Sequence, residues 1–218
     1  RVYSRTIGRR LAACSDRARR LVEAAAVVGD GATLATAAAL AEVDEPLPEL
    51  EEACDAGLFD PAECSPAGRL AFAHPLVRAA VYGQLTPIRR LRLHHEAALL
   101  VGDERAALHH RAEATQPPDD ELAAELQCFS DRVRAAGQWR EAAWAQLESG
   151  RFSRRGAQRE RRLLRAVGLL GDAGAAADVT LRELGTAADG PLRDVTVGYV
   201  ALLQGRAAEA HRLLHAAW

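Results

Sequence analysis

The chain has 218 residues and carries 28 basic residues, all of them Arg, against 30 Asp and Glu, for a net charge of −2 at pH 7. Such a balance provides no overall attraction to nucleic acid or to an anionic membrane surface. There is no run of eighteen apolar residues and no charged-then-apolar leader, which argues against a membrane span and a signal peptide.

The cysteines at positions 14, 54, 64 and 128 show no C-x-x-C spacing. They are typical of reduced, small apolar residues in a cytoplasmic protein, and the spacing supports neither a zinc site nor a disulfide. The chain contains no Met, so it lacks a start of its own, and we expect it to be a piece of a longer protein.

The first hundred residues predict three helices and a β-hairpin. Residues 1–14 are basic and weakly patterned, and we expect the tail of a linker or helix from an upstream domain. Ser15, Thr33 and Asp44 can each cap a helix, and the first of these helices ends at Gly29. On the third helix the apolar face is expected to hold Leu47, Leu50, Cys54 and Leu58.

The hairpin is expected between residues 58 and 73, with a turn at 65–68 that holds Pro and Gly. Leu70 and Phe72 alternate with Ala as in a strand. His74 then stands at an N-cap position and Pro75 at the first helical position, where proline is favoured. Three helices and a hairpin in this order predict a winged helix.

Two further helices are predicted before the clearest linker signal, at residues 116–120. Thr86 and Pro87 open the first, and Asp103 caps the second, which runs to about residue 115. One apolar stripe of the first helix is expected to face inward, with its histidine hydrogen-bonded in the core. This stripe consists of Ile88, Leu91, His95 and Leu99.

After residue 120 the pattern is helical and repeats every 34 residues, the tetratricopeptide period. The repeated glycine allows a left-handed turn between two helices, and the repeated alanine lets them approach closely. The aromatic residue usual near the start of each unit is missing, so the repeats are degenerate. The positions that keep the period are Gly137, Gly171 and Gly205, together with Ala142, Ala176 and Ala210.

Residues 69–100, RLAFAHPLVRAAVYGQLTPIRRLRLHHEAALL, resemble the segment after the nucleotide-binding domain of bacterial LuxR-type STAND regulators. The resemblance implies a mainly α fold: a winged helix with a short β-hairpin, then an α-α superhelix of tetratricopeptide-like hairpins. We place the winged-helix domain with its linking helix at 1–102 and the helical repeats at 103–218. The repeat units are expected near 123–153, 157–187 and 191–218.

The same resemblance implies an upstream ATPase domain that binds ATP or ADP and a C-terminal LuxR-type helix-turn-helix that binds DNA. Neither lies in this chain, which has no phosphate-binding loop and no catalytic motif, so we do not expect an enzyme. The AHPLV corner is similar to the HDLV corner of related ATPases, with Pro75 in place of the acid. His74 would then contact the phosphate of bound ADP; alternatively it only caps its helix.

Direct DNA reading by this winged helix is disfavoured by charge. Residues 21–68 contain eleven acidic residues and no basic one, and the third helix alone carries five acids. A recognition helix of this kind would be repelled by phosphates. The acidic face could instead meet a basic surface on another domain of the same protein.

A second candidate site is a basic groove in the repeats, because residues 151–165 contain seven arginines. The first helices of such repeats line a concave surface, which could bind an acidic peptide or an anionic effector. A solvated Arg-rich face is the alternative. The residues predicted to face the groove are Gln127, Arg134, Gln158, Arg161, Arg165 and Tyr199.

His211 and His215 have a metal-compatible spacing but no evident third ligand, so a solvated or packing pair is expected. The sequence therefore predicts a sensor fragment that couples effector or partner binding in the repeats to a nucleotide switch, with no direct DNA contact and no membrane. Two alternatives stay open: a protein–protein scaffold without nucleotide control, and the arm region of a STAND cyclase or kinase. The upstream and downstream sequences would discriminate among them.

Overall fold

The computed structural model describes residues 2–64, 68–154, 156–172, 190–203 and 205–217. The predicted turn at 65–68 therefore falls mostly outside the described residues, as do Ala176 and most of the second half of the predicted unit 157–187. The chain divides into two compact units, 1–115 and 116–218. Our predicted boundary was at 102, whereas the division coincides with the linker signal at 116–120.

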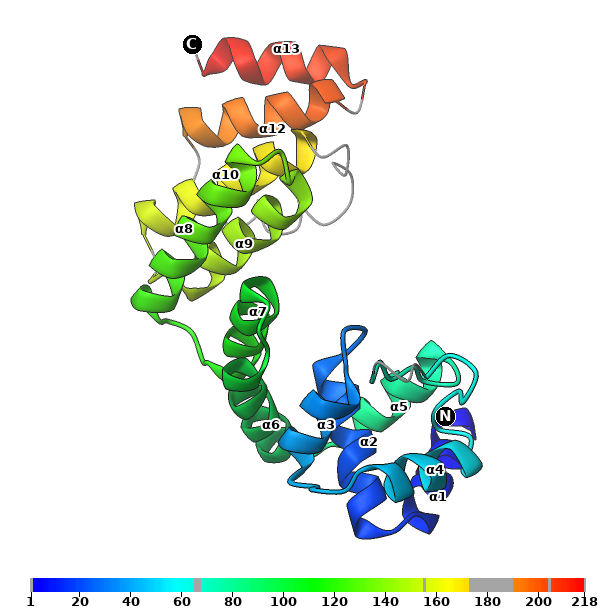
Figure 1. The fold of residues 1–218 in the computed structure, drawn as a ribbon. Coiled ribbons are helices and arrows are strands. Elements are labelled where there is room, and N and C mark those ends of the chain that lie inside the picture. Colours follow the sequence, from blue (N-terminus) through cyan, green and yellow to red (C-terminus); the bar gives the residue numbers. More distant parts are fainter. Residues whose placement is uncertain (1, 65–67, 155, 173–189, 204, 218) are drawn as a thin grey trace. The chain divides into compact units, whose positions relative to one another are not determined.

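The described residues of unit 1 form seven helices, shown in blue to green in Figure 1. Helix α2 packs against α3, α4, α5 and α6, and α7 packs against α6. The small and branched residues of α2 are almost all buried, which lets four neighbours approach one helix closely. The helices are α1 (Val2–Ala13), α2 (Asp16–Val28), α3 (Leu34–Ala41), α4 (Leu47–Asp55), α5 (Pro75–Gln84), α6 (Pro87–Leu100) and α7 (Glu104–Ala114).

Side-chain caps begin most of these helices where the sequence places them. Ser15, Thr33, Thr86 and Asp103 each accept a backbone N–H from the first turn of their helix. Asp44 was predicted to cap α4, but it does not. That helix begins later, after Pro46, without a side-chain cap. Pro48, in the first turn, has no N–H, so this turn has one donor fewer to satisfy.

The N-terminal stretch is helical, one of the two forms expected, but it packs within unit 1 instead of belonging to an upstream domain, and the predicted hairpin differs from expectation. This helix, α1, packs on α5 and buries Ile7 and Leu11. Between α4 and α5 the described residues contain no strand, only isolated antiparallel bridges from Phe59 to Phe72 and from Thr33 to residue 69. The two phenylalanine rings pack with centroids 4.9 Å apart. The chain is thus mainly helical, and the expected hairpin is reduced to these bridges.

Of two predicted apolar faces, the one on α6 is turned differently in the structure and the one on α4 is largely kept. On α6, Ile88 is 81% exposed and Leu99 78% exposed, while the buried residues are Leu93, His94 and Ala97. The stripe expected to face the core, His95 included, is therefore a surface stripe. The face predicted for the third helix, α4, is largely confirmed: Leu58 is buried and Leu50 and Cys54 pack against the core, while Leu47 is 64% exposed.

Unit 2 is a succession of packed helices: α8 on α9, α9 on α10, α10 on α12, and α12 on α13 (Figure 1). Gly137 and Gly205 turn the chain between α8 and α9 and between α12 and α13 with φ of 78° and 74°, as the repeat predicted. Gly171 differs, because it lies inside α10. The helices are α8 (Asp120–Ala135), α9 (Trp139–Phe152), α10 (Ala157–Asp172), α12 (Pro191–Leu203) and α13 (Ala207–Ala216).

The small residues of unit 2 allow close helix contact. A Cβ added at Gly171 would lie 2.6 Å from Leu203 Cδ1, and one at Gly150 would lie 2.5 Å from Leu163 Cδ2. Ala142 and Ala210, which share a position in the 34-residue repeat, are both buried. Among the described helices, none is long and apolar enough to cross a membrane.

We expect Gly150→Ala to lower the free energy of unfolding of unit 2 by roughly 1–3 kcal/mol, because its methyl group would collide with Leu163. Gly168→Ala is the matched control, since a Cβ there meets nothing within 4 Å. It should raise stability by about 0.5–1 kcal/mol through helix propensity. Urea unfolding followed by circular dichroism measures both, and equal effects of the two changes would contradict the packing argument.

Candidate functional site

A cavity of about 470 Å³ opens among the helices of unit 2. Helix α8 contributes Gln127, α9 contributes Gln146, α10 contributes most of the remainder, and α12 contributes Thr196. The volume lies in the range of small-molecule sites. Its lining is dominated by cationic and amide side chains: Gln127, Gln146, Gln158, Arg161, Arg162, Leu164, Arg165 and Thr196.

Arg162 is the most constrained cation of this cavity, and only 7% of it is exposed. Its Nε donates to Gln127 Oε1 at 2.7 Å and its Nη1 to Ser153 Oγ at 2.5 Å. Both partners are neutral, and no carboxylate within the described part of the chain pairs with this guanidinium. Burial lowers the pKa of Arg162, and the more distant charge of Asp120 opposes this only in part.

The other two arginines of the cavity differ in their partners. Arg165 donates from Nη2 to Asp131 Oδ1 at 2.6 Å, so its charge is compensated. Arg161 is exposed, and among the described residues it has no ion-pair partner. The cavity therefore holds two guanidinium groups, those of Arg161 and Arg162, without a paired acid.

Gln146 is fully buried, and neither its amide oxygen nor its amide nitrogen has a hydrogen-bond partner in the described structure. Leaving a buried donor or acceptor unsatisfied costs about 1–3 kcal/mol per group. Such a residue at the wall of a polar cavity indicates a place where a bound molecule, or water, would supply the missing partners.

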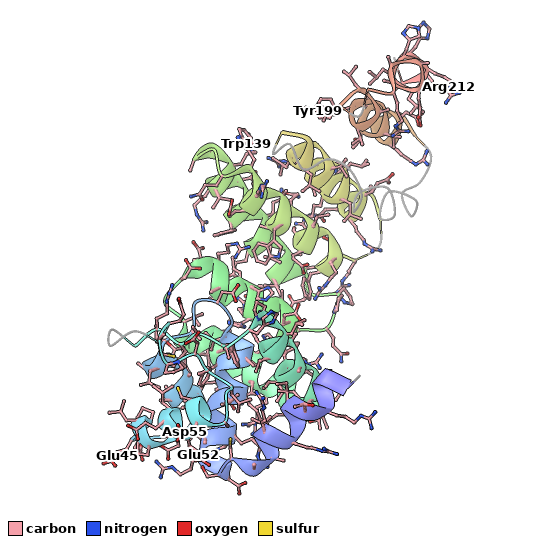
Figure 2. The ribbon with its side chains drawn as sticks, turned by 90° about the vertical axis from the view of Figure 1, so that its right-hand side faces the viewer. Glu45, Glu52, Asp55, Trp139, Tyr199 and Arg212 are labelled. Atoms are coloured by element: carbon pink, nitrogen blue, oxygen red, sulfur yellow. The ribbon has the colours of Figure 1, made fainter. Side chains whose placement is uncertain are left out.

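Four of the six residues predicted for the groove line this cavity: Gln127, Gln158, Arg161 and Arg165. Arg134 is exposed on α8 away from the lining, and Tyr199 on α12 instead lies against Gly171, whose added Cβ would come within 2.9 Å of the ring. Figure 2 labels Tyr199 on its helix.

Sequence reasoning missed Arg162 and Gln146. Arg162 lies 35 residues after Gln127, whereas the repeat has 34 residues, so a strict repeat register does not place Arg162 in the groove. Gln146 had a usable signal: it is an amide residue three and four positions from Ala142, Ala143 and Ser149, which are all buried on one face of α9. A polar side chain on a small-residue face indicates a buried polar position.

Comparison of the chain with protein-family models, with curated protein sequences and with solved structures finds no match. The assignment of a function therefore depends on the geometry of this chain.

His74 stands where the sequence predicted it, as N-cap of α5, and its Nδ1 accepts the N–H of Leu76 at 3.1 Å. The side chain is exposed, so its Nε2 is available to another partner. The structure thus accounts for a capping role, and contact with a nucleotide phosphate stays a prediction.

The acidic face of unit 1 is partly used within the unit itself. Glu49 pairs with Arg17 at 2.5 Å, and the carboxylate of Glu52 accepts hydrogen bonds from the N–H and the Oγ–H of Ser15, each at 2.6 Å. The two bonds lower the pKa of Glu52. Figure 2 shows Glu45, Glu52 and Asp55 close together at one edge of the unit.

A buried polar cluster that the sequence did not predict joins α5, α6 and α7. The hydroxyl of Tyr82 lies 2.9 Å from His94 Nε2, and His94 Nδ1 lies 2.9 Å from His110 Nδ1. His94 and His110 are 2% and 1% exposed. Two histidines that are adjacent in sequence face different directions on a helix. Of the pair at 94 and 95, His94 is buried, and of the pair at 109 and 110, His110 is buried.

Burial, followed by the charges of neighbouring groups, lowers the pKa of each of these histidines to about 4. The neighbouring groups that lower these pKa values are Arg90 on α6 and His109 on α7, whereas the carboxylate of Glu113 on α7 raises the pKa of His110. Both rings are consequently neutral at pH 7. Among the described residues no group of three or more His, Cys, Asp or Glu could hold a metal ion, and His211 and His215 are exposed on α13.

We expect unit 1 to lose stability as the pH falls from about 6.5 towards 4. The pKa of a buried histidine is lowered in the folded state from its ordinary 6.5, so the folded form binds fewer protons than the unfolded form across this window. Each histidine accounts for roughly 3 kcal/mol of the loss by pH 4 and for roughly 2 kcal/mol by pH 5. Urea unfolding at pH 7, 5.5 and 4 measures it.

His95→Gln is the matched control, because His95 is the exposed neighbour of His94. This variant should keep the pH dependence of the wild type, whereas His110→Gln should weaken it. An unchanged slope in His110→Gln would show that the buried pair does not titrate in this way.

Proposed function

We propose that this chain is the regulatory arm of a LuxR-type STAND transcriptional regulator, in which unit 2 binds an anionic effector or an acidic peptide. The observation that carries the proposal is the Arg- and Gln-lined cavity of unit 2, with two guanidinium groups that have no acid partner among the described residues. Arg recognises carboxylates and phosphates through its fork of N–H donors.

The arrangement of unit 2 supports tetratricopeptide-like repeats. Two ion pairs join residues that are 34 positions apart, Arg165 with Asp131 and Arg154 with Asp120 at 2.8 Å. In a stack of equal units, a contact between neighbouring first helices joins equivalent positions, so the sequence separation equals the repeat length. The left-handed turns at Gly137 and Gly205 support the same register.

For unit 1 we propose a winged-helix domain that relays a conformational change and does not read DNA. Helices α2, α3 and α4, followed by the two bridges before α5, have the order of a winged helix with a reduced wing. The acidic residues of α4 oppose contact with phosphates. The upstream ATPase and the DNA-binding helix-turn-helix would lie elsewhere in the full protein.

The switch we propose is a population shift. In the resting state His74 contacts the phosphate of ADP held by the ATPase domain, and the effector stabilises an open state by binding it more tightly than the closed state. A scaffold without nucleotide control would have the same helical stack, but it would not respond to a change at His74.

We expect an acidic octapeptide to bind the chain, with Arg161→Gln weakening the affinity about two- to fivefold, because one ion pair with a solvent-exposed guanidinium is lost. The affinity should fall as salt is raised. Isothermal titration calorimetry measures both effects. Arg134→Gln is the control, since Arg134 is exposed on the same unit but outside the cavity. Equal losses in the two variants would identify a diffuse basic surface instead.

In the full-length protein we expect His74→Ala to raise basal activation, measured as transcription from the target promoter without effector. His74→Asn is the matched variant, because Asn preserves the N-cap while removing the imidazole. Basal output should rise in both. A rise in His74→Ala alone would assign the effect to loss of the cap, and no rise in either would reject the sensor role.

A further inference from the structure

The strongest feature of the cavity in unit 2 is a buried positive charge that no acidic side chain among the described residues pairs with. Buried charges in proteins are normally paired with an opposite charge, because an isolated ion in a low-dielectric interior is costly. Arg162 is 93% buried, and its hydrogen-bond partners in the described part of the chain are the amide oxygen of Gln127 and the hydroxyl of Ser153. These groups orient the guanidinium but leave its positive charge in place.

A second uncompensated cation lines the same cavity. Arg161 is adjacent in sequence to Arg162 and has no ion-pair partner within the described residues, whereas Arg165 is neutralised by Asp131. Among the described residues, the cavity lining therefore carries two guanidinium charges without a paired acid, one buried on Arg162 and one solvent-exposed on Arg161. A single carboxylate would balance only one of them.

The neutral lining specifies further hydrogen bonding. Gln146 lines the cavity from a fully buried position, and its N–H₂ and C=O are both unsatisfied but shielded from solvent, so a ligand reaches them only when this side chain turns towards the cavity. A ligand that satisfies it must carry both an acceptor and a donor, as an oxyanion with a neighbouring hydroxyl or amide does. The volume of about 470 Å³ admits a ligand of small-metabolite size.

We propose that the effector of unit 2 is a small dianion, whose two negative charges pair with Arg161 and Arg162 and whose polar body contacts Gln146. This inference rests on the proposed function and narrows it from any anionic partner to a doubly charged small molecule. A phosphate monoester and a dicarboxylate share this chemistry, since each carries about two negative charges at pH 7.

The first test is calorimetric titration of the whole chain with glycerol 3-phosphate, succinate and acetate at fixed ionic strength. Binding of at least one dianion about tenfold or more tightly than acetate is expected, because acetate balances only one guanidinium. Preference for glycerol 3-phosphate identifies a phosphate monoester and preference for succinate a dicarboxylate. Equal affinity for acetate and both dianions overturns the proposal.

The second test uses Gln146→Glu, an almost isosteric change that places a carboxylate at the cavity wall beside the unpaired arginines. Because the protein would then supply part of the missing negative charge, dianion affinity should fall about tenfold or more while the melting temperature of unit 2 is kept or raised. Glu125→Gln, on the exposed side of α8, is the control and should leave affinity unchanged. Undiminished dianion binding by Gln146→Glu overturns the proposal.

A third test measures the dianion affinity of Arg162→Lys, a variant that keeps the positive charge at this position. Lysine keeps the positive charge but lacks the fork that reaches Gln127 and Ser153. A loss of dianion affinity larger than that of Arg134→Gln is expected. Binding of an acidic peptide with no binding of either dianion would reject this inference and leave the proposed function standing, whereas absence of both would reject the two together.

Discussion

A short series of buried hydrogen bonds holds α8, α9 and α10 together, and the cavity of unit 2 depends on it. Ser130 donates from α8 to a carbonyl of α9 at 2.8 Å, and Ser149 donates from α9 to a carbonyl of α8 at 2.6 Å. Ser153 donates to the carbonyl of Ser149 and accepts from Arg162, which also reaches Gln127. Small hydroxyl side chains permit both the close helix approach and the hydrogen bonds, so the guanidinium of Arg162 is fixed before any partner binds.

This arrangement connects stability with recognition in unit 2. A buried cation oriented by neutral groups lowers the stability of the unit relative to a paired one, and a partner that supplies negative charge would recover that free energy on binding. The free-energy cost of orienting the guanidinium is met during folding. This pre-organisation favours the affinity for a negatively charged ligand. Unit 1 uses the opposite solution at Glu49, whose charge is paired with Arg17 within the unit.

The sequence predicted best what is decided locally. Caps at Ser15 and Thr86 depend on a few neighbouring residues and were found, and the 34-residue period located the turns at Gly137 and Gly205. Helix faces depend on tertiary neighbours. On α6 a stripe that includes Ile88 lies at the surface, because α2, α3 and α7 pack against other faces of that helix. Periodicity predicted half of the residues that line the cavity, because it identifies the outward positions on repeated helices. It gives no information on whether a buried side chain such as Arg162 has a partner of opposite charge.

The Tyr82–His94–His110 cluster has a consequence for where its hydrogen atoms reside. Each neutral imidazole carries one N–H, so a single choice orders the whole series. If the phenol donates to His94 Nε2, then His94 donates through Nδ1 and His110 keeps its hydrogen on Nε2; if the phenol accepts, every bond in the series reverses. Tautomer exchange in these two rings is therefore concerted, and the orientation of one hydroxyl on α5 fixes which edge of a ring on α7 presents a lone pair.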